Sequence, residues 1–129
     1  MSKKILIVDD ETDILTTIKT IFERLNYDVI TVNNGLDCIK EIEKGFKGVI
    51  LMDIMMPDMD GWDTIREIIK KGLTNGIIIE VITGKGTINH EKINGLESYI
   101  YDYITKPFDI EKLISSVKKS EFYLSAIEN

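Results

Sequence analysis

The sequence alternates short apolar runs of strand length with longer amphipathic segments, and this alternation restricts the fold more than any other feature. Five of the runs have the β-branched, largely unbroken apolar character of strands that are buried on both faces of a sheet. They span residues 4–9, 28–32, 48–53, 77–83 and 100–105. Five strands in series, separated by helical segments, predict an α/β fold in which a doubly wound, five-stranded parallel sheet carries helices on both faces.

The segments between the strands predict the helices. In most of them isoleucine, leucine and phenylalanine recur at helical spacing. The third helix is expected over residues 61–71 with Asp60 as its N-cap, and Asp109 is expected to cap the last helix. A short polar segment, residues 87–97, predicts the fourth helix.

The chain length of 129 residues suits a single domain that occupies residues 1–129, with a core over about residues 3–119. In the last helix the apolar spacing changes at Glu121. Residues 120–129 are therefore either the end of a helix that packs on the sheet or the start of a linker.

Charge and composition limit the partners. The 16 basic and 22 acidic residues give a net charge of −6, which argues against direct binding of nucleic acid. No apolar run approaches the roughly 20 residues that a membrane span needs, and the first residues lead directly into a strand rather than a signal peptide. The single cysteine, Cys38, excludes an internal disulfide. These features predict a soluble, cytoplasmic protein.

Polar residues lie at the ends of four of the five predicted strands. Asp9 and Asp10 lie at the end of the first strand, Asp53 at the end of the third, Thr83 at the end of the fourth, and Lys106 directly after the fifth. Each has an ordinary explanation alone, such as a helix cap or a solvated surface charge. Because function in an open parallel sheet collects beyond the carboxyl ends of the strands, their joint placement predicts one shared site.

The chemistry of this residue set favours phosphoryl transfer to an aspartate. Three neighbouring carboxylates repel one another unless a cation lies among them, and Mg²⁺ is a hard ion that prefers oxygen ligands. A lysine and a hydroxyl would neutralise or bind the oxygens of a phosphoryl group. The sequence has no Gly-rich loop of the type that cradles ATP, so another phosphorylated molecule is the expected donor.

The same residues resemble the signature of response regulator receiver domains. The matching elements are Asp9-Asp10, the segment DIMMPDMDG that begins at Asp53, Thr83, and the KPF sequence that begins at Lys106. The resemblance covers nearly the whole chain. It implies a flavodoxin-like (βα)5 fold with strand order 2-1-3-4-5 and a role in two-component signal transduction, either as a stand-alone receiver or as part of a longer protein.

The resemblance also implies a phosphoacceptor and a metal site. Asp53 would take a phosphoryl group from the phosphohistidine of a histidine kinase or a phosphotransfer protein. Asp10 and Asp53, with the backbone carbonyl of Met55, would bind Mg²⁺, and Asp9 would help through water. The protein would not be an enzyme beyond self-phosphorylation and self-dephosphorylation. The second reaction is expected to be slow, because the apolar Met55 side chain cannot orient an attacking water.

A switch follows from the same resemblance. Thr83 and Tyr103 would form the switch pair, Lys106 would contact the phosphoryl oxygens, and the Lys106–Pro107 peptide bond would be cis. The face made by the fourth helix, fifth strand and fifth helix would bind a downstream protein. The alternating tyrosines of residues 99–103 are expected on one side of their strand, which would suit a partner or a homodimer.

Three other functions can be weighed against the sequence pattern. An aspartate-nucleophile phosphatase of the haloacid dehalogenase type is disfavoured, because such an enzyme carries a second aspartate at the position where this chain has Met55. A flavodoxin-type flavin domain is also disfavoured, because it needs a phosphate-binding loop where this chain has the acidic residues 9–11, which would repel a phosphate. A receiver-like module that docks to partners without phosphorylation stays open as the alternative.

Overall fold

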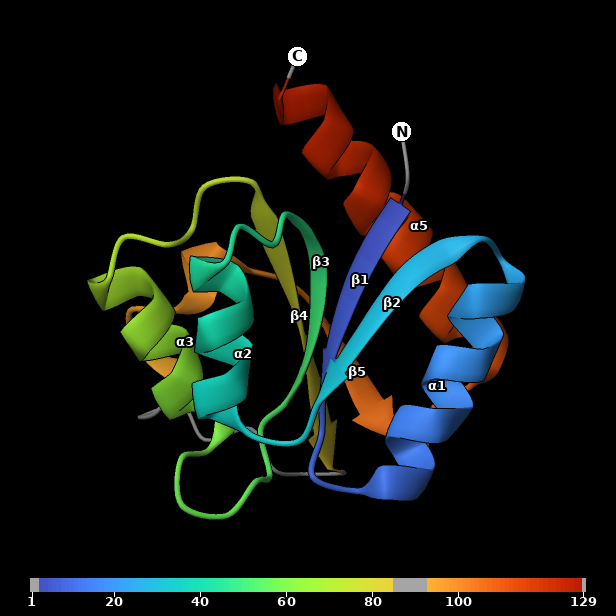
Figure 1. Ribbon diagram of the computed structural model, residues 1–129, viewed down its shortest axis with the longest axis horizontal. Coiled ribbons are helices and arrows are strands. Elements are labelled where there is room, and N and C mark those ends of the chain that lie inside the picture. The colour runs from blue at the N-terminus through green and yellow to red at the C-terminus, as the bar shows by residue number, and fades with distance from the viewer. Residues whose placement is uncertain (1–2, 85–92, 129) are drawn as a thin grey trace.

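The computed structural model describes residues 3–84 and 93–128 of the chain. Five parallel strands form a single sheet in the order β2-β1-β3-β4-β5, which confirms the predicted fold class and strand order (Figure 1). The strands are β1 (Lys3–Val8), β2 (Tyr27–Val32), β3 (Gly48–Asp53), β4 (Ile77–Gly84) and β5 (Ile100–Lys106). Each lies within one residue of its expected bounds, because an unbroken apolar run requires a strand that is covered on both faces.

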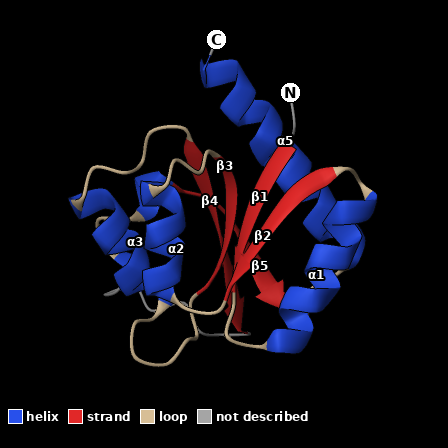
Figure 2. Cartoon of the chain, viewed as in Figure 1, coloured by secondary structure: helices blue, strands red, loops and turns tan. Residues whose placement is uncertain are grey.

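Helices cover both faces of the sheet (Figure 2). The helical elements are α1 (Thr12–Arg24), α2 (Gly35–Glu43), α3 (Gly61–Lys70), the short 3₁₀ turn η1 (Glu97–Tyr99) and α5 (Ile110–Glu128). Helices α1 and α5 pack on one face, and α2 and α3 pack on the other. Most of the helix expected over residues 87–97 lies outside the described residues. No helix in the described part of the chain is long and apolar enough to span a membrane.

The strands build two apolar cores because successive side chains point to opposite faces of the sheet. In β1, Ile5 and Ile7 pack with the residues of α1 and α5, whereas Leu6 and Val8 pack with those of α2 and α3. All four side chains are fully buried. The strand is therefore held from both sides, and its carboxyl end has a fixed position.

Both expected helix caps are present. The Asp60 carboxylate accepts a hydrogen bond from the N–H of Asp63 at 2.8 Å, which begins α3. The Asp109 carboxylate accepts hydrogen bonds from the N–H groups of Glu111 at 2.8 Å and Lys112 at 3.2 Å, which begin α5. These caps satisfy amide groups that have no partner within the helix. They also define where the loops at the carboxyl edge of the sheet end.

The alternating tyrosines around β5 do not share one side of the strand, so that prediction is wrong. A β-bulge leaves Tyr101 as an extra residue before the pair formed by Glu80 and Asp102. The Tyr101 ring packs edge-on against Tyr123 of α5, with ring centroids 5.4 Å apart. Tyr103 instead packs against the core on the α2 and α3 side. A strict period of two fails here because the extra residue resets the alternation.

The change of apolar spacing at Glu121 does not change the buried side of α5. The buried positions of α5 continue in one stripe through Leu113, Val117, Ser120 and Leu124. The stripe is hard to recognise from sequence because Ser120 is polar. Phe122 and Ile127 are exposed, at 77% and 62%. Residues 120–128 are the last turns of a helix that packs on the sheet.

Candidate functional site

Three carboxylates meet beyond the carboxyl ends of β1 and β3. Each of Asp9, Asp10 and Asp53 places one carboxylate oxygen within 4.8 Å of a carboxylate oxygen of the other two. Asp9 and Asp53 are buried, whereas Asp10 is exposed. The central position of β1 and β3 in the sheet order brings these residues together, although 43 residues separate Asp10 from Asp53.

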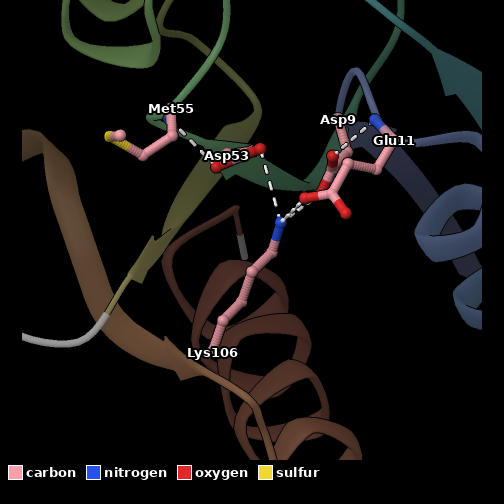
Figure 3. Close-up of polar contacts among 5 residues, drawn as sticks. All are labelled: Asp9, Glu11, Asp53, Met55 and Lys106. Carbon is pink, nitrogen blue, oxygen red and sulfur yellow. Dashed lines mark hydrogen bonds and ion pairs between the residues drawn. The ribbon is translucent and has the colours of Figure 1, made fainter.

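Backbone amides orient the two buried carboxylates (Figure 3). The N–H of Glu11 donates to Asp9 Oδ1 at 2.9 Å, and the N–H of Met55 donates to Asp53 Oδ1 at 3.0 Å. Each bond joins a side chain to the amide two residues on, the geometry of an Asx turn. One oxygen of each carboxylate is thereby fixed, and Oδ2 of each accepts from Lys106.

Lys106 reaches this cluster from the end of β5. Its Nζ lies 2.9 Å from Asp9 Oδ2, 3.2 Å from Glu11 Oε1 and 3.5 Å from Asp53 Oδ2 (Figure 3). The next peptide bond, Lys106–Pro107, is cis. One ammonium thus bridges two strand ends and the start of α1.

The electrostatics of the cluster are unbalanced towards negative charge. The pKa of Asp53 is raised to about 6: burial is the largest influence and raises it, Asp9 also raises it, and the Met55 N–H and Lys106 lower it. Burial alone would lower the pKa of Lys106, but its contacts with Asp9, Asp53 and Glu11 raise it above its ordinary value. Lys106 therefore stays charged, and a further cation would relieve the repulsion among the carboxylates.

The expected switch residues lie on β4, which is next to β3, and on β5, which is next to β4. Asp53 pairs with Ile82 of β4, so Thr83 is one residue beyond the level of Asp53 on the neighbouring strand. Thr83 is buried, and it pairs with Thr105 of β5. Tyr103 lies two residues before Thr105 and is partly buried. The hydroxyl and the ring are therefore linked to the cluster through two adjacent strands.

A comparison with models of protein families shows which family the chain belongs to. The family model described as the response regulator receiver domain matches residues 5–118. The chain belongs to the response regulator receiver domain family. This receiver domain has acidic residues after β1, an aspartate at the end of β3 and a lysine at the end of β5.

Curated relatives of this receiver domain include longer proteins. It is 36% identical over 118 residues to the alkaline phosphatase synthesis transcriptional regulatory protein PhoP of Bacillus subtilis, a match that covers 92% of this chain and 48% of the relative. It is 34% identical over 118 residues to the regulatory protein VanRc of Enterococcus gallinarum, covering 92% and 49%. The chain thus spans about half the length of the curated relatives that it matches.

Solved structures of receiver domains have the same architecture. A CheY-like receiver domain protein from Methanospirillum hungatei matches with a TM-score of 0.86 and 43% identity, over 98% of each chain. The receiver domain of the Francisella response regulator 1452 matches with a TM-score of 0.81 and 30% identity, over 95% of this chain and 98% of the other. Both comparisons place the chain among receiver domains in fold and in sequence.

Two residues contribute to the site of this receiver domain in ways that sequence patterns do not predict directly. Glu11 contacts Lys106, and its only signal in the sequence is its place next to Asp10 in an acidic run. Gly61 lets α3 begin against the end of β3, because a Cβ at this position would lie 2.6 Å from the carbonyl oxygen of Asp53. Its place in the DIMMPDMDG segment marks the residue, but the close approach requires the structure.

Proposed function

We propose that Asp53 is a phosphoacceptor that takes a phosphoryl group from the phosphohistidine of a histidine kinase or a phosphotransfer protein. The observation that carries this proposal is the convergence of Asp53 with Lys106, Asp9 and Asp10 at the carboxyl edge of the sheet. Membership of the receiver family supports it. As a signalling domain, the protein would change its own state and would not turn over a separate substrate.

In the proposed transfer, a carboxylate oxygen of Asp53 attacks the phosphorus atom of the donor. A phosphorus–oxygen bond forms as the phosphorus–nitrogen bond to histidine breaks, and the electron pair of that bond stays on the imidazole nitrogen. The product is an aspartyl phosphate. Lys106, which already lies 3.5 Å from Asp53, would bind the oxygens of the transferred group and neutralise charge on them.

The carboxylates of this site fit a hard divalent cation. Three oxygen ligands within 4.8 Å of one another, two of them on buried residues, match the donors that Mg²⁺ prefers. Asp10 and Asp53, with the carbonyl of Met55, would hold the ion directly, and Asp9 would hold it through water. When bound, Mg²⁺ would supply positive charge that offsets the carboxylates and the oxygens of the incoming group.

Phosphorylation would change the protein through Thr83, Tyr103 and Lys106. The new phosphoryl oxygens would attract the Thr83 hydroxyl and the Lys106 ammonium, which would draw the ends of β4 and β5 towards Asp53. Tyr103 would follow inward on β5. The face formed by β5, α5 and the fourth helix would then bind a downstream protein or a second copy of the chain.

The alternative, a docking module that works without phosphorylation, makes a different prediction. The wild-type protein and the Asp53→Asn variant are incubated with acetyl phosphate, with and without Mg²⁺, and their intact masses are measured. We expect one phosphoryl group on the wild type with Mg²⁺, and none on Asp53→Asn or without Mg²⁺. A folded wild type that gains no phosphoryl group would favour the docking module.

A further inference from the structure

A second polar cluster lies beneath α5, away from the carboxylates at the sheet edge. It consists of Glu80 on β4, Asp102 on β5, and Ser116 and Ser120 on α5. Glu80 and Ser120 have no exposed surface. Glu80 interrupts the apolar run IIIEVIT of an inner strand, and neither the proposed transfer nor the expected switch uses it.

The two serines of α5 connect its buried side to the sheet. The Ser116 hydroxyl lies within hydrogen-bonding distance of Glu80 Oε1, and at 2.9 Å from Asp102 Oδ2. The Ser120 hydroxyl donates to Glu80 Oε2. Asp102 Oδ1 also accepts from the N–H of Tyr103 at 2.8 Å. The cluster therefore joins one helix to two adjacent strands.

Counting hydrogens shows that this cluster is one proton short if both acids are ionised. Ser116 carries a single hydroxyl hydrogen, yet its oxygen faces a carboxylate oxygen of Glu80 and another of Asp102. With two carboxylates, only one of these contacts could be a hydrogen bond, and the other would bring two lone pairs together. A proton on Glu80 completes the chain, because Glu80 then donates to Ser116 and Ser116 donates to Asp102.

The surroundings of Glu80 also favour the neutral acid. On its side of the sheet, β5 contributes the like charge of Asp102, β3 contributes Leu51, and α5 contributes the two serines. Lys112 and Lys119 of α5 line the surface hollow that Asp102 borders, and among the described residues no ion pair involves Glu80. Burying a charge without a counter-ion is costly.

The pKa of Glu80 agrees with this arrangement. Burial, the largest influence, raises it; the hydrogen bonds from Ser116 and Ser120 lower it in part, and the charge of Asp102 raises it again. The net direction is upward, from an ordinary value of 4.5. The folded protein thus binds the proton more tightly than the unfolded chain does.

We propose that Glu80 holds a proton at neutral pH and that this proton fastens α5 to β4 and β5, so that α5 loosens when the proton is lost. A stability contribution from a raised carboxyl pKa is complete at low pH and is lost as the pH rises through the folded-state value. The surface formed by α5 and β5 would then respond to alkaline pH independently of phosphorylation at Asp53.

Carbon NMR of the glutamate carboxyl groups tests the protonation directly. The signal of Glu80 is assigned by its absence in Glu80→Gln. We expect the Glu80 carboxyl carbon to keep the chemical shift of a protonated acid at neutral pH. If that carbon has the chemical shift of a carboxylate at neutral pH, the proposal is wrong.

A second measurement tests the consequence for α5. Glu80→Gln keeps the size of the side chain and can donate to Ser116, but it does not titrate. The urea midpoint of the wild type is expected to fall relative to that of Glu80→Gln as the pH rises from 5 to 8. At pH 8 the backbone amide hydrogens of residues 117–124 should exchange with solvent faster in the wild type than in Glu80→Gln. Parallel midpoints and equal exchange rates would overturn the proposal. Asp53 is present in both proteins, so its contribution to the pH dependence of the urea midpoint cancels when the two are compared.

Discussion

Asp53 is buried beside Asp9 and Lys106, and burial raises the pKa of its carboxyl group from 3.8 to about 6. Between these values the folded protein binds more protons than the unfolded chain, so stability falls as the pH rises from about 4 to about 6. In the absence of Mg²⁺, Asp53→Asn should therefore be more stable than the wild type at pH 7, by on the order of 2 kcal/mol, and similar to it near pH 4.

Urea unfolding at a series of pH values measures this difference. Asp13→Asn, at an exposed position in the first turn of α1, is the matched control for the loss of one carboxylate. A variant Asp53→Asn that is less stable than the wild type at pH 7 would show that the contact with Lys106 outweighs the cost of burying the charge.

We expect the phosphoryl group on Asp53 to have a long lifetime, because the side chain of Met55 cannot orient an attacking water. Met55 is 63% exposed and lies two residues after Asp53. An amide at this position could orient a water molecule towards the phosphorus atom, so Met55→Asn should shorten the lifetime by about tenfold or more, and Met55→Leu should leave it unchanged. Intact-protein mass spectrometry after removal of the donor follows the decay. Equal decay rates in all three proteins would count against this role.

Single residues also show what sequence reasoning can find. Asp9, Asp53 and Lys106 were predictable because polar residues at the ends of apolar strands are conspicuous and because parallel strands bring their carboxyl ends together. The partnership of Glu11 with Lys106 was not, since a side chain on the first turn after a strand has many available directions. The cluster around Glu80 could not be predicted from sequence either, because the hydroxyl partners of Glu80 lie 36 and 40 residues further along the chain.

At the scale of elements, the start of α3 depends on Gly61. A Cβ there would lie 2.6 Å from the carbonyl oxygen of Asp53 and 2.6 Å from the Cα of Ile54. Although alanine is favoured over glycine in helices, this overlap should make Gly61→Ala less stable than the wild type by about 1–3 kcal/mol and should displace Asp53.

The free energy of unfolding in urea and the rate of phosphorylation from acetyl phosphate are the two measurements for Gly61→Ala. Lys70→Ala, an exposed substitution on the same helix, is the control and should change stability by no more than about 0.5 kcal/mol. Unchanged stability and an unchanged rate in Gly61→Ala would mean that α3 and β3 can separate at no cost.

The elements differ in how well the sequence predicts them. The strands and the caps at Asp60 and Asp109 depend on residues close together in the sequence, and their predicted positions agree with the structure. The bulge at Tyr101 is not local, because it depends on how β5 pairs with β4. The buried stripe of α5 is not recognisable from apolar spacing alone, because two of its inward residues, Ser116 and Ser120, are serines whose partner is a buried carboxylate.

At the scale of the whole molecule, the order of strands creates the site. Placing β1 and β3 side by side in the centre of the sheet brings the acidic residues of one against the aspartate of the other, and β4 and β5 add Thr83 and Lys106 at the same edge. The alternation of strands and helices predicts such an edge. The strand order itself came from the resemblance to receiver domains and agrees with the structure.

The central claim is that Asp53 carries the phosphoryl group. After incubation with acetyl phosphate and Mg²⁺, borohydride reduces an aspartyl phosphate to homoserine, and digestion with trypsin separates the candidates: Asp53 lies in the peptide of residues 48–66, and Asp9 and Asp10 lie in that of residues 5–19. Fragmentation by mass spectrometry should place homoserine at position 53. Homoserine at position 9 or 10, or at neither peptide in a folded wild-type protein, would contradict the account.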